Sequence, residues 1–188
     1  MTKGAPRKPC LGLLLFFLFS GLVLTMHDMR PENRPAASHG CIDLSSFDFS
    51  RNGTARLDGE WEFRPDTPVD SVTPLFVKVP GSLSFGKHSF AAPSASHGSG
   101  SYRLEVRLPR HDGSLALYVQ QIFSAAEISV NGTSVYRAGV AGTSASDTAP
   151  GFSPEMIPLP LQTGETMTIV CHVANFSYYK GGILSSIY

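Results

Sequence analysis

Apolar and charged residues alternate between Tyr102 and Leu108 with a period of two. This spacing constrains the fold more than any other feature, because it fits a β-strand with one buried and one solvated face and does not fit a helix. Pro109 ends the alternation, and Asp112-Gly113 turns the chain into a second strand-like segment, 114–121. The sequence therefore predicts successive strands here.

Two later segments extend this pattern. Residues 126–130 alternate in the same way, and the Asn131-Gly132 pair that follows favours a type I′ hairpin, because both residues tolerate positive φ. Thr166–Ala174 is almost continuously apolar or β-branched, as expected of a strand near the centre of a sheet. No segment after residue 41 has convincing helical periodicity. We therefore predict an all-β domain, with a sandwich or jelly roll as the simplest architecture.

Two long segments do not fit strands. Residues 86–101 and 138–154 consist mainly of small and polar residues, with several glycines and prolines. Loops of this length inside a compact domain are usually either functional or disordered, and the sequence leaves both alternatives open.

The N-terminus has the features of an export signal. Three basic residues (Lys3, Arg7 and Lys8) precede an apolar run from Leu11 to Met26. The run is shorter than the roughly 20 residues of a comfortable membrane span, so residues 1–26 are either a cleaved signal peptide or a retained signal anchor. Residues 27–40 are polar and predict a linker, which leaves 41–188 as one extracytoplasmic domain.

Composition argues against several functions. Basic and acidic residues are equal in number, 15 of each, and the N-terminal basic cluster leaves the rest slightly acidic, which argues against nucleic-acid binding. The three cysteines are not spaced as metal ligands, and no phosphate-binding loop or nucleophile motif occurs. The acids at 58, 60 and 62 alternate with Gly59, Trp61 and Phe63, which favours the wet face of a strand over a catalytic carboxylate pair. We predict no catalytic residues, no metal and no cofactor.

A series of short motifs carries a resemblance to a known family. In chain order these are Gly40-Cys41-Ile42-Asp43-Leu44, Leu57-Asp58-Gly59-Glu60-Trp61-Glu62-Phe63, Val79-Pro80-Gly81-Ser82, Gly100-Ser101-Tyr102-Arg103-Leu104, Ser124-Ala125 before Val130-Asn131-Gly132, and Val173-Ala174-Asn175-Phe176 with Gly181-Gly182-Ile183. This order resembles the extracellular domain of bacterial seven-transmembrane receptors with diverse intracellular signalling modules. That domain is a jelly roll similar to the sugar-binding, galactose-binding-like domain of family-2 glycoside hydrolases.

The resemblance implies a non-catalytic sensor on the outer face of the cytoplasmic membrane. Its ligand would be a small polar molecule, of which a carbohydrate is one candidate. Because relatives continue into seven membrane helices and a signalling output, the chain is expected to be a fragment of a longer receptor. Two alternatives remain open: an accessory domain of a family-2 glycosidase such as a β-galactosidase, and a purely structural domain.

Arg103 is the best candidate for ligand binding, because a guanidinium can hold a hydroxyl or an anion from the solvated face of its strand. Its alternative role is a cross-strand partner of Glu105 or another acid. His88, in the preceding loop, and Tyr102 complete the predicted site, although Tyr102 faces the opposite side of the strand, which favours its interpretation as core.

Cys41 and Cys171 lie at the start of the domain and in its last long strand. Export would allow a disulfide between them, since oxidising compartments preserve such bonds. The sequence leaves this bond and two unrelated thiols as equal alternatives.

Overall fold

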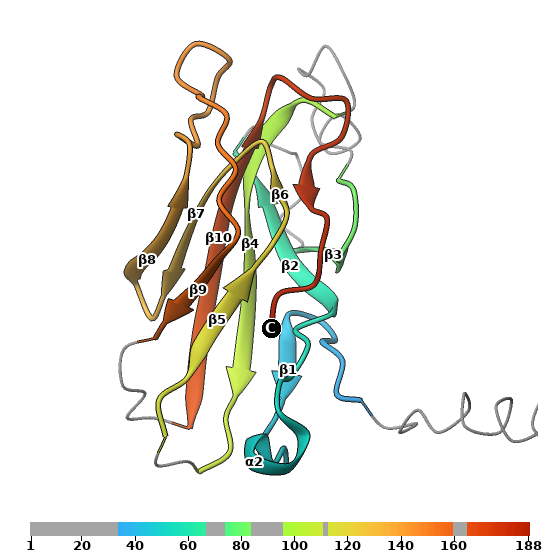
Figure 1. Cartoon of the computed structure of the whole chain (residues 1–188). Helices are drawn as coiled ribbons and strands as arrows, with labels where there is room; N and C mark the ends of the chain where they lie inside the picture. The colour runs from blue at the N-terminus through green and yellow to red at the C-terminus, as the bar shows by residue number, and fades with distance from the viewer. Residues whose placement is uncertain (1–33, 67–73, 84–95, 111–112, 160–164) are drawn as a thin grey trace, which may run out of the picture. The chain divides into compact units, whose positions relative to one another are not determined.

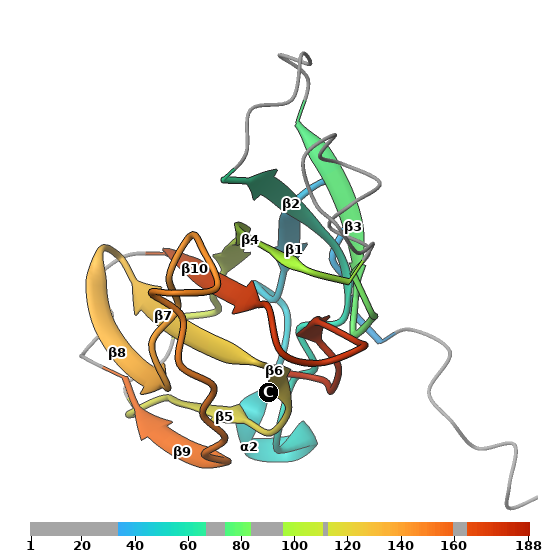
Figure 2. The ribbon, with the colours of Figure 1, turned by 90° about the horizontal axis from the view of Figure 1, so that it is seen from above.

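Strands form nearly all the regular structure of the protein in the computed structural model, which describes residues 34–66, 74–83, 96–110, 113–159 and 165–188 (Figure 1). They form an all-β sandwich, as the alternating sequence pattern predicted. Seen from above, β5 and β9 lie in a layer of their own beside β7, β8 and β10 (Figure 2). The predicted targeting segment, 1–26, lies outside the described residues.

The larger layer is a seven-stranded sheet in the order β3-β2-β4-β10-β7-β8, with β1 also paired to β4. β10 lies antiparallel between β4 and β7, so the apolar segment 166–174 is a central strand, as predicted. β1 runs parallel to β4 along the edge that β2 also uses. The strands are β1 (Cys41–Asp43), β2 (Gly59–Pro65), β3 (Leu75–Val79), β4 (Gly98–Arg107), β7 (Ala125–Val130), β8 (Thr133–Ala138) and β10 (Thr166–Asn175).

The second layer contains two short antiparallel pairs, β5 (Ala116–Val119) with β9 (Glu155–Pro158) and β6 (Ile122–Phe123) with β11 (Gly182–Ile183). The chain continues from β11 along β5, where the backbones of Tyr118 and Tyr188 exchange two hydrogen bonds of 2.8 and 3.2 Å. The residues after β11 therefore form a further extended segment beside β5.

β4 contributes one of its two faces to the core, as the alternation of apolar and charged residues in its sequence predicts. The even-numbered residues Tyr102, Leu104 and Val106 are at most 1% exposed, whereas Arg103 and Glu105 are on the outer face. Trp61 is also fully buried, and its indole N–H donates to the Leu57 carbonyl at 2.8 Å. Trp61 is therefore a core residue and is not available to stack on a sugar.

The predicted hairpin is present between β7 and β8. Asn131 and Gly132 have φ angles of 49° and 82°, the positive values that a type I′ turn needs. The Asn131 side chain also accepts a hydrogen bond of 2.8 Å from the Thr168 N–H, which ties the turn to β10.

The domain begins earlier than the sequence predicted. The compact unit starts at Pro35, and Ala37, which was assigned to the linker, is buried and exchanges backbone hydrogen bonds with the start of β2. Gly59 permits this approach, because its φ is +133° and a Cβ there would lie 2.2 Å from the Ala37 carbonyl oxygen. These backbone contacts were not predictable from the sequence, because the segment before Cys41 is polar and contains proline.

β4 also begins earlier than predicted, at Gly98, inside the segment 86–101 that was assigned to a loop. Small residues are required here, because a Cβ on Gly100 would lie 2.5 Å from the Phe63 ring on β2. The glycine therefore makes room for a core aromatic and does not break the strand.

The second predicted loop is ordered by its own contacts. Val140 and Ala149 exchange backbone hydrogen bonds of 2.8 and 3.0 Å, and the Thr148 hydroxyl donates to the Ser144 carbonyl. Of the two alternatives for 138–154, disorder is therefore wrong.

One short helix, α2 (Phe49–Asn52), was not predicted. The Asp48 carboxylate caps it by accepting hydrogen bonds from the N–H groups of Ser50 and Arg51. The Ser50 hydroxyl also donates to this carboxylate. Together these hydrogen bonds, most of all that from the hydroxyl, hold the pKa of Asp48 below its ordinary value.

Candidate functional site

Arg103 has the cross-strand role that the sequence offered as its alternative. Its guanidinium is partly exposed and lies 3.5 Å from a Glu62 carboxylate oxygen on β2 and 3.6 Å from Glu105. Glu62 is almost buried and is also paired with Arg64 at 2.7 Å. Two carboxylates therefore already engage the cation that was predicted to bind a ligand.

Tyr102, a second predicted ligand residue, does not join Arg103. Tyr102 points to the opposite side of β4, is 1% exposed and packs edge-to-face on Phe63 with 4.9 Å between ring centroids. Burial raises the pKa of its hydroxyl. Its prediction as a ligand contact is wrong, because the alternation that exposes Arg103 buries its neighbour. His88 lies outside the described residues.

Cys41 and Cys171 are free thiols in the structure. They lie on strands on either side of β4, opposite Glu105 and Tyr102 respectively. Two strand spacings of about 4.8 Å put their Cα atoms well beyond the ~7 Å limit of a disulfide. The bond is therefore wrong, and the alternative of two unrelated thiols is correct. Burial raises the pKa of the Cys171 thiol.

Three aromatic rings from separate segments meet at β6, which lies toward the end of the sandwich away from α2 (Figure 1). Phe123 of β6 stacks on Phe152 with 6.1 Å between centroids and 10° between planes, and it lies 5.5 Å from the Tyr178 ring. We call Phe123, Phe152 and Tyr178 the aromatic cluster. Phe152 is 57% exposed and Tyr178 45%, so two of the three rings present apolar surface to the solvent. Tyr179 beside them is 83% exposed.

Buried polar contacts hold the aromatic cluster in place. The fully buried Asn175 at the end of β10 donates to the carbonyls of Ser96 and Tyr178 at 2.8 and 2.9 Å and accepts from the Tyr178 N–H at 3.1 Å. Asn175 therefore ties off the end of β10 through its side-chain amide. On the other side, the Gly151 N–H donates to the Ser124 carbonyl at 2.9 Å, which sets the position of Phe152.

The aromatic cluster offers flat apolar surfaces with nearby hydroxyl and ammonium groups. The Lys180 Nζ lies 5.6 Å from the centroid of the Tyr179 ring, within the range of a cation–π contact. Such a surface can stack on the C–H face of a sugar ring while polar groups contact its hydroxyls. The sequence analysis missed these residues; the available signal was the presence of aromatic residues in otherwise polar loops.

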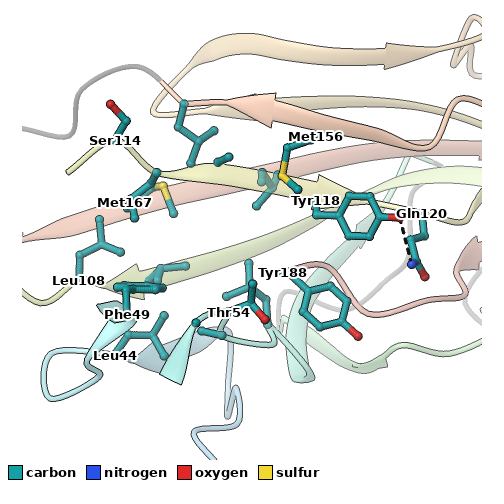
Figure 3. Close-up of a pocket in the computed structure, with 18 residues that line it drawn as sticks. Leu44, Phe49, Thr54, Leu108, Ser114, Tyr118, Gln120, Met156, Met167 and Tyr188 are labelled. Carbon is teal, nitrogen blue, oxygen red and sulfur yellow. Dashed lines mark hydrogen bonds between the residues drawn. The ribbon is translucent and has the colours of Figure 1, made fainter. Parts of the chain in front are cut away.

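A pocket of about 500 Å³ opens at the opposite end, beside α2 (Figure 3). Its lining is mainly apolar, with a few hydroxyl groups and the Gln120 amide, which donates to the Tyr118 hydroxyl at 3.3 Å. No charged side chain lines it within the described part of the chain. The lining residues are Leu44, Phe49, Gly53, Thr54, Ala55, Leu57, Val106, Leu108, Ser114, Leu115, Ala116, Leu117, Tyr118, Gln120, Met156, Leu159, Met167 and Tyr188.

Metal and membrane features are absent from the described ranges. Among these residues no group of three or more His, Cys, Asp or Glu side chains could hold a metal ion. Nor does any helix there have the length and apolar character needed to cross a membrane.

Comparison with solved structures finds a similar fold in parts of glycosidase chains. No protein-family model and no curated protein matches the sequence. Among solved structures, a β-glucuronidase from Ruminococcus gnavus matches 70% of this chain with a TM-score of 0.51 and 17% identity. A putative β-galactosidase from Bacteroides fragilis matches 71% with a TM-score of 0.52 and 16% identity. The match spans only 28% and 22% of those chains, respectively. The likeness shows a shared β-sandwich fold.

Proposed function

We propose that this chain is a non-catalytic carbohydrate-binding domain that acts outside the cytoplasm, and that the sugar lies on the aromatic cluster. The exposure of Phe152 and Tyr178 is the observation that carries this proposal. Exposed rings held by buried polar contacts keep their positions without a ligand, which lowers the entropic cost of binding. The glycosidase chains that share the fold act on sugars, which supports the same ligand class.

The ion pairs and the exposure of the acidic residues on β2 agree with a non-catalytic role. Glu62, the most buried of them, is neutralised by Arg64 and Arg103. Glu60 is exposed and near His39, at 3.9 Å. Glycoside hydrolysis instead needs two carboxyl groups that face each other across a sugar.

Two settings are compatible with such a domain. The fold likeness favours an accessory domain of a family-2 glycosidase. The basic residues and apolar run at the N-terminus favour the sensor domain of an envelope receptor, since they direct a chain into or across the membrane. An alkaline phosphatase fusion at Tyr188 tests export directly: activity supports an extracytoplasmic domain, and a silent fusion contradicts it.

Sugar binding is tested with a glycan array followed by calorimetric titration of the best hit. Phe152→Ala and Tyr178→Ala should each weaken binding by about tenfold, because each removes one stacking surface. Phe76→Ala is the matched control, since Phe76 is 41% exposed on β3, outside the aromatic cluster. Failure of the folded chain to bind any glycan, or equal binding by all three variants, would contradict the proposal.

A further inference from the structure

The two exposed rings of the aromatic cluster are not coplanar. The plane of Phe152 is only 10° from that of Phe123, whereas the plane of Tyr178 is tilted from it by 49°. The planes of Phe152 and Tyr178 therefore differ by at least 39°, which is 49° less 10°. Both rings lie beside Phe123, with centroids 6.1 and 5.5 Å from its own. The aromatic cluster therefore presents two adjoining faces at an angle and not one flat platform.

Hydrogen bonds on both sides of Phe152 fix the segment that carries its ring. The Gly151 N–H donates to the Ser124 carbonyl at 2.9 Å, and the Ser153 carbonyl accepts from the Tyr136 hydroxyl at 2.7 Å. The backbone position of Phe152 is therefore set by β7 and β8, which adjoin Ser124 and contain Tyr136.

The segments that carry Tyr178 and Phe123 are fixed as well. The Asn175 amide donates to the Tyr178 carbonyl and accepts from the Tyr178 N–H, at 2.9 and 3.1 Å. Phe123 pairs with Gly182 between β6 and β11. Anchored backbone and the ring contacts with Phe123 together set the tilt between the two exposed rings, so the angle is present before a ligand binds.

The tilt restricts which sugar chains can use both rings. A sugar stacks by laying the C–H face of its ring parallel to an aromatic ring. In a chain of the cellulose type the successive sugar rings lie close to one plane, so a rigid flat ribbon can lie parallel to Phe152 or to Tyr178 but not to both. In chains of the starch or laminarin type each linkage turns the next sugar ring, and the chain follows a helix. Neighbouring units of such a chain can therefore lie parallel to different aromatic rings.

We infer that the aromatic cluster binds a helically curved glycan chain, with neighbouring sugar units stacked on Phe152 and Tyr178. This inference rests on the proposed function and adds to it the class of glycan. A flat ribbon would stack on one ring at a time and would lose the second contact.

The test is calorimetric titration of the full chain with three glucose hexasaccharides that differ only in linkage: maltohexaose, laminarihexaose and cellohexaose. At least one of the two curved chains should bind about tenfold or more tightly than cellohexaose, because only a curved chain stacks on both rings. Tyr178→Ala should lower the affinity for that chain about tenfold and leave the affinity for cellohexaose nearly unchanged. Phe152→Ala provides the same test if the first variant does not fold. The control Phe76→Ala should retain the preference, since Phe76 is on β3, outside the aromatic cluster.

Three results would overturn the inference and leave sugar binding itself standing. These are equal or tighter binding of cellohexaose, an unchanged linkage preference in Tyr178→Ala, and binding of glucose alone as tight as that of the hexasaccharides. If none of the three hexasaccharides binds, the glycan array decides. Hits that are curved chains support the inference, whereas hits that are single sugars or flat chains such as chitin or mannan overturn it. An array without any hit contradicts the proposed function and this inference with it.

Discussion

Replacing Asn175 with alanine should destabilise the domain by about 3 kcal/mol. The side chain is fully buried and makes three hydrogen bonds, to the carbonyls of Ser96 and Tyr178 and to the Tyr178 N–H. A hydrogen bond of this kind contributes roughly 0.5–1.5 kcal/mol net, and three of them give the expected total. Alanine leaves no group that could replace them.

The measurement is urea unfolding followed by tryptophan fluorescence. Trp61 is the only tryptophan and is fully buried, so its emission reports on the core. Ser134→Ala is the control, because it removes one exposed hydrogen bond of 2.8 Å to Glu127 and should change stability by no more than about 0.5 kcal/mol.

A loss of stability in Asn175→Ala no larger than that of the control would refute this reasoning. It would mean that water replaces the amide at no cost and that the Tyr178 turn is held by other contacts. A second readout follows from the geometry. Under conditions where Asn175→Ala remains folded, its affinity for a glycan bound at the aromatic cluster should also fall, because Tyr178 loses two of its anchoring contacts.

Two further predictions concern the core. Gly100→Val should unfold the domain or cost at least about 3 kcal/mol in urea unfolding, because its side chain would overlap the Phe63 ring, whereas Gly113→Ala, with open space around it, should be tolerated. In native protein treated with iodoacetamide, peptide mapping should find Cys41 labelled and Cys171 protected until urea is added, since burial raises the pKa of the Cys171 thiol. A Cys171 peptide labelled at the native rate would contradict the buried assignment.

The strands were predictable because their signals are local. Alternation in β4, the Asn131-Gly132 turn and the apolar segment of β10 each depend on residues close together in sequence. The start of β4 was missed because the need for glycine at position 100 comes from a residue distant in sequence. The Phe63 ring on β2 occupies the space that a side chain on Gly100 would need. Glycine in a polar segment gives no sign of that neighbour.

The candidate site was not predictable for a related reason. The aromatic cluster combines residues from β6, from the segment before β9 and from the turn after β10, and only the pairing of distant strands brings them together. For Arg103 the sequence correctly gave an outer-face position and an acidic partner. It could not show that Glu62 on β2 would occupy the same guanidinium.

The central place of β10 has a consequence for how the chain folds. Both of its neighbours, β4 and β7, precede it by dozens of residues. They can pair with β10 only after Thr166–Asn175 has been synthesised. Until then the strands on the β4 side and the hairpin of β7 and β8 have no shared hydrogen bonds. Such non-local pairing slows folding, so a nascent chain stays open through most of its synthesis. Under the export proposed above, a sheet that closes late would leave the chain unfolded while it crosses the membrane.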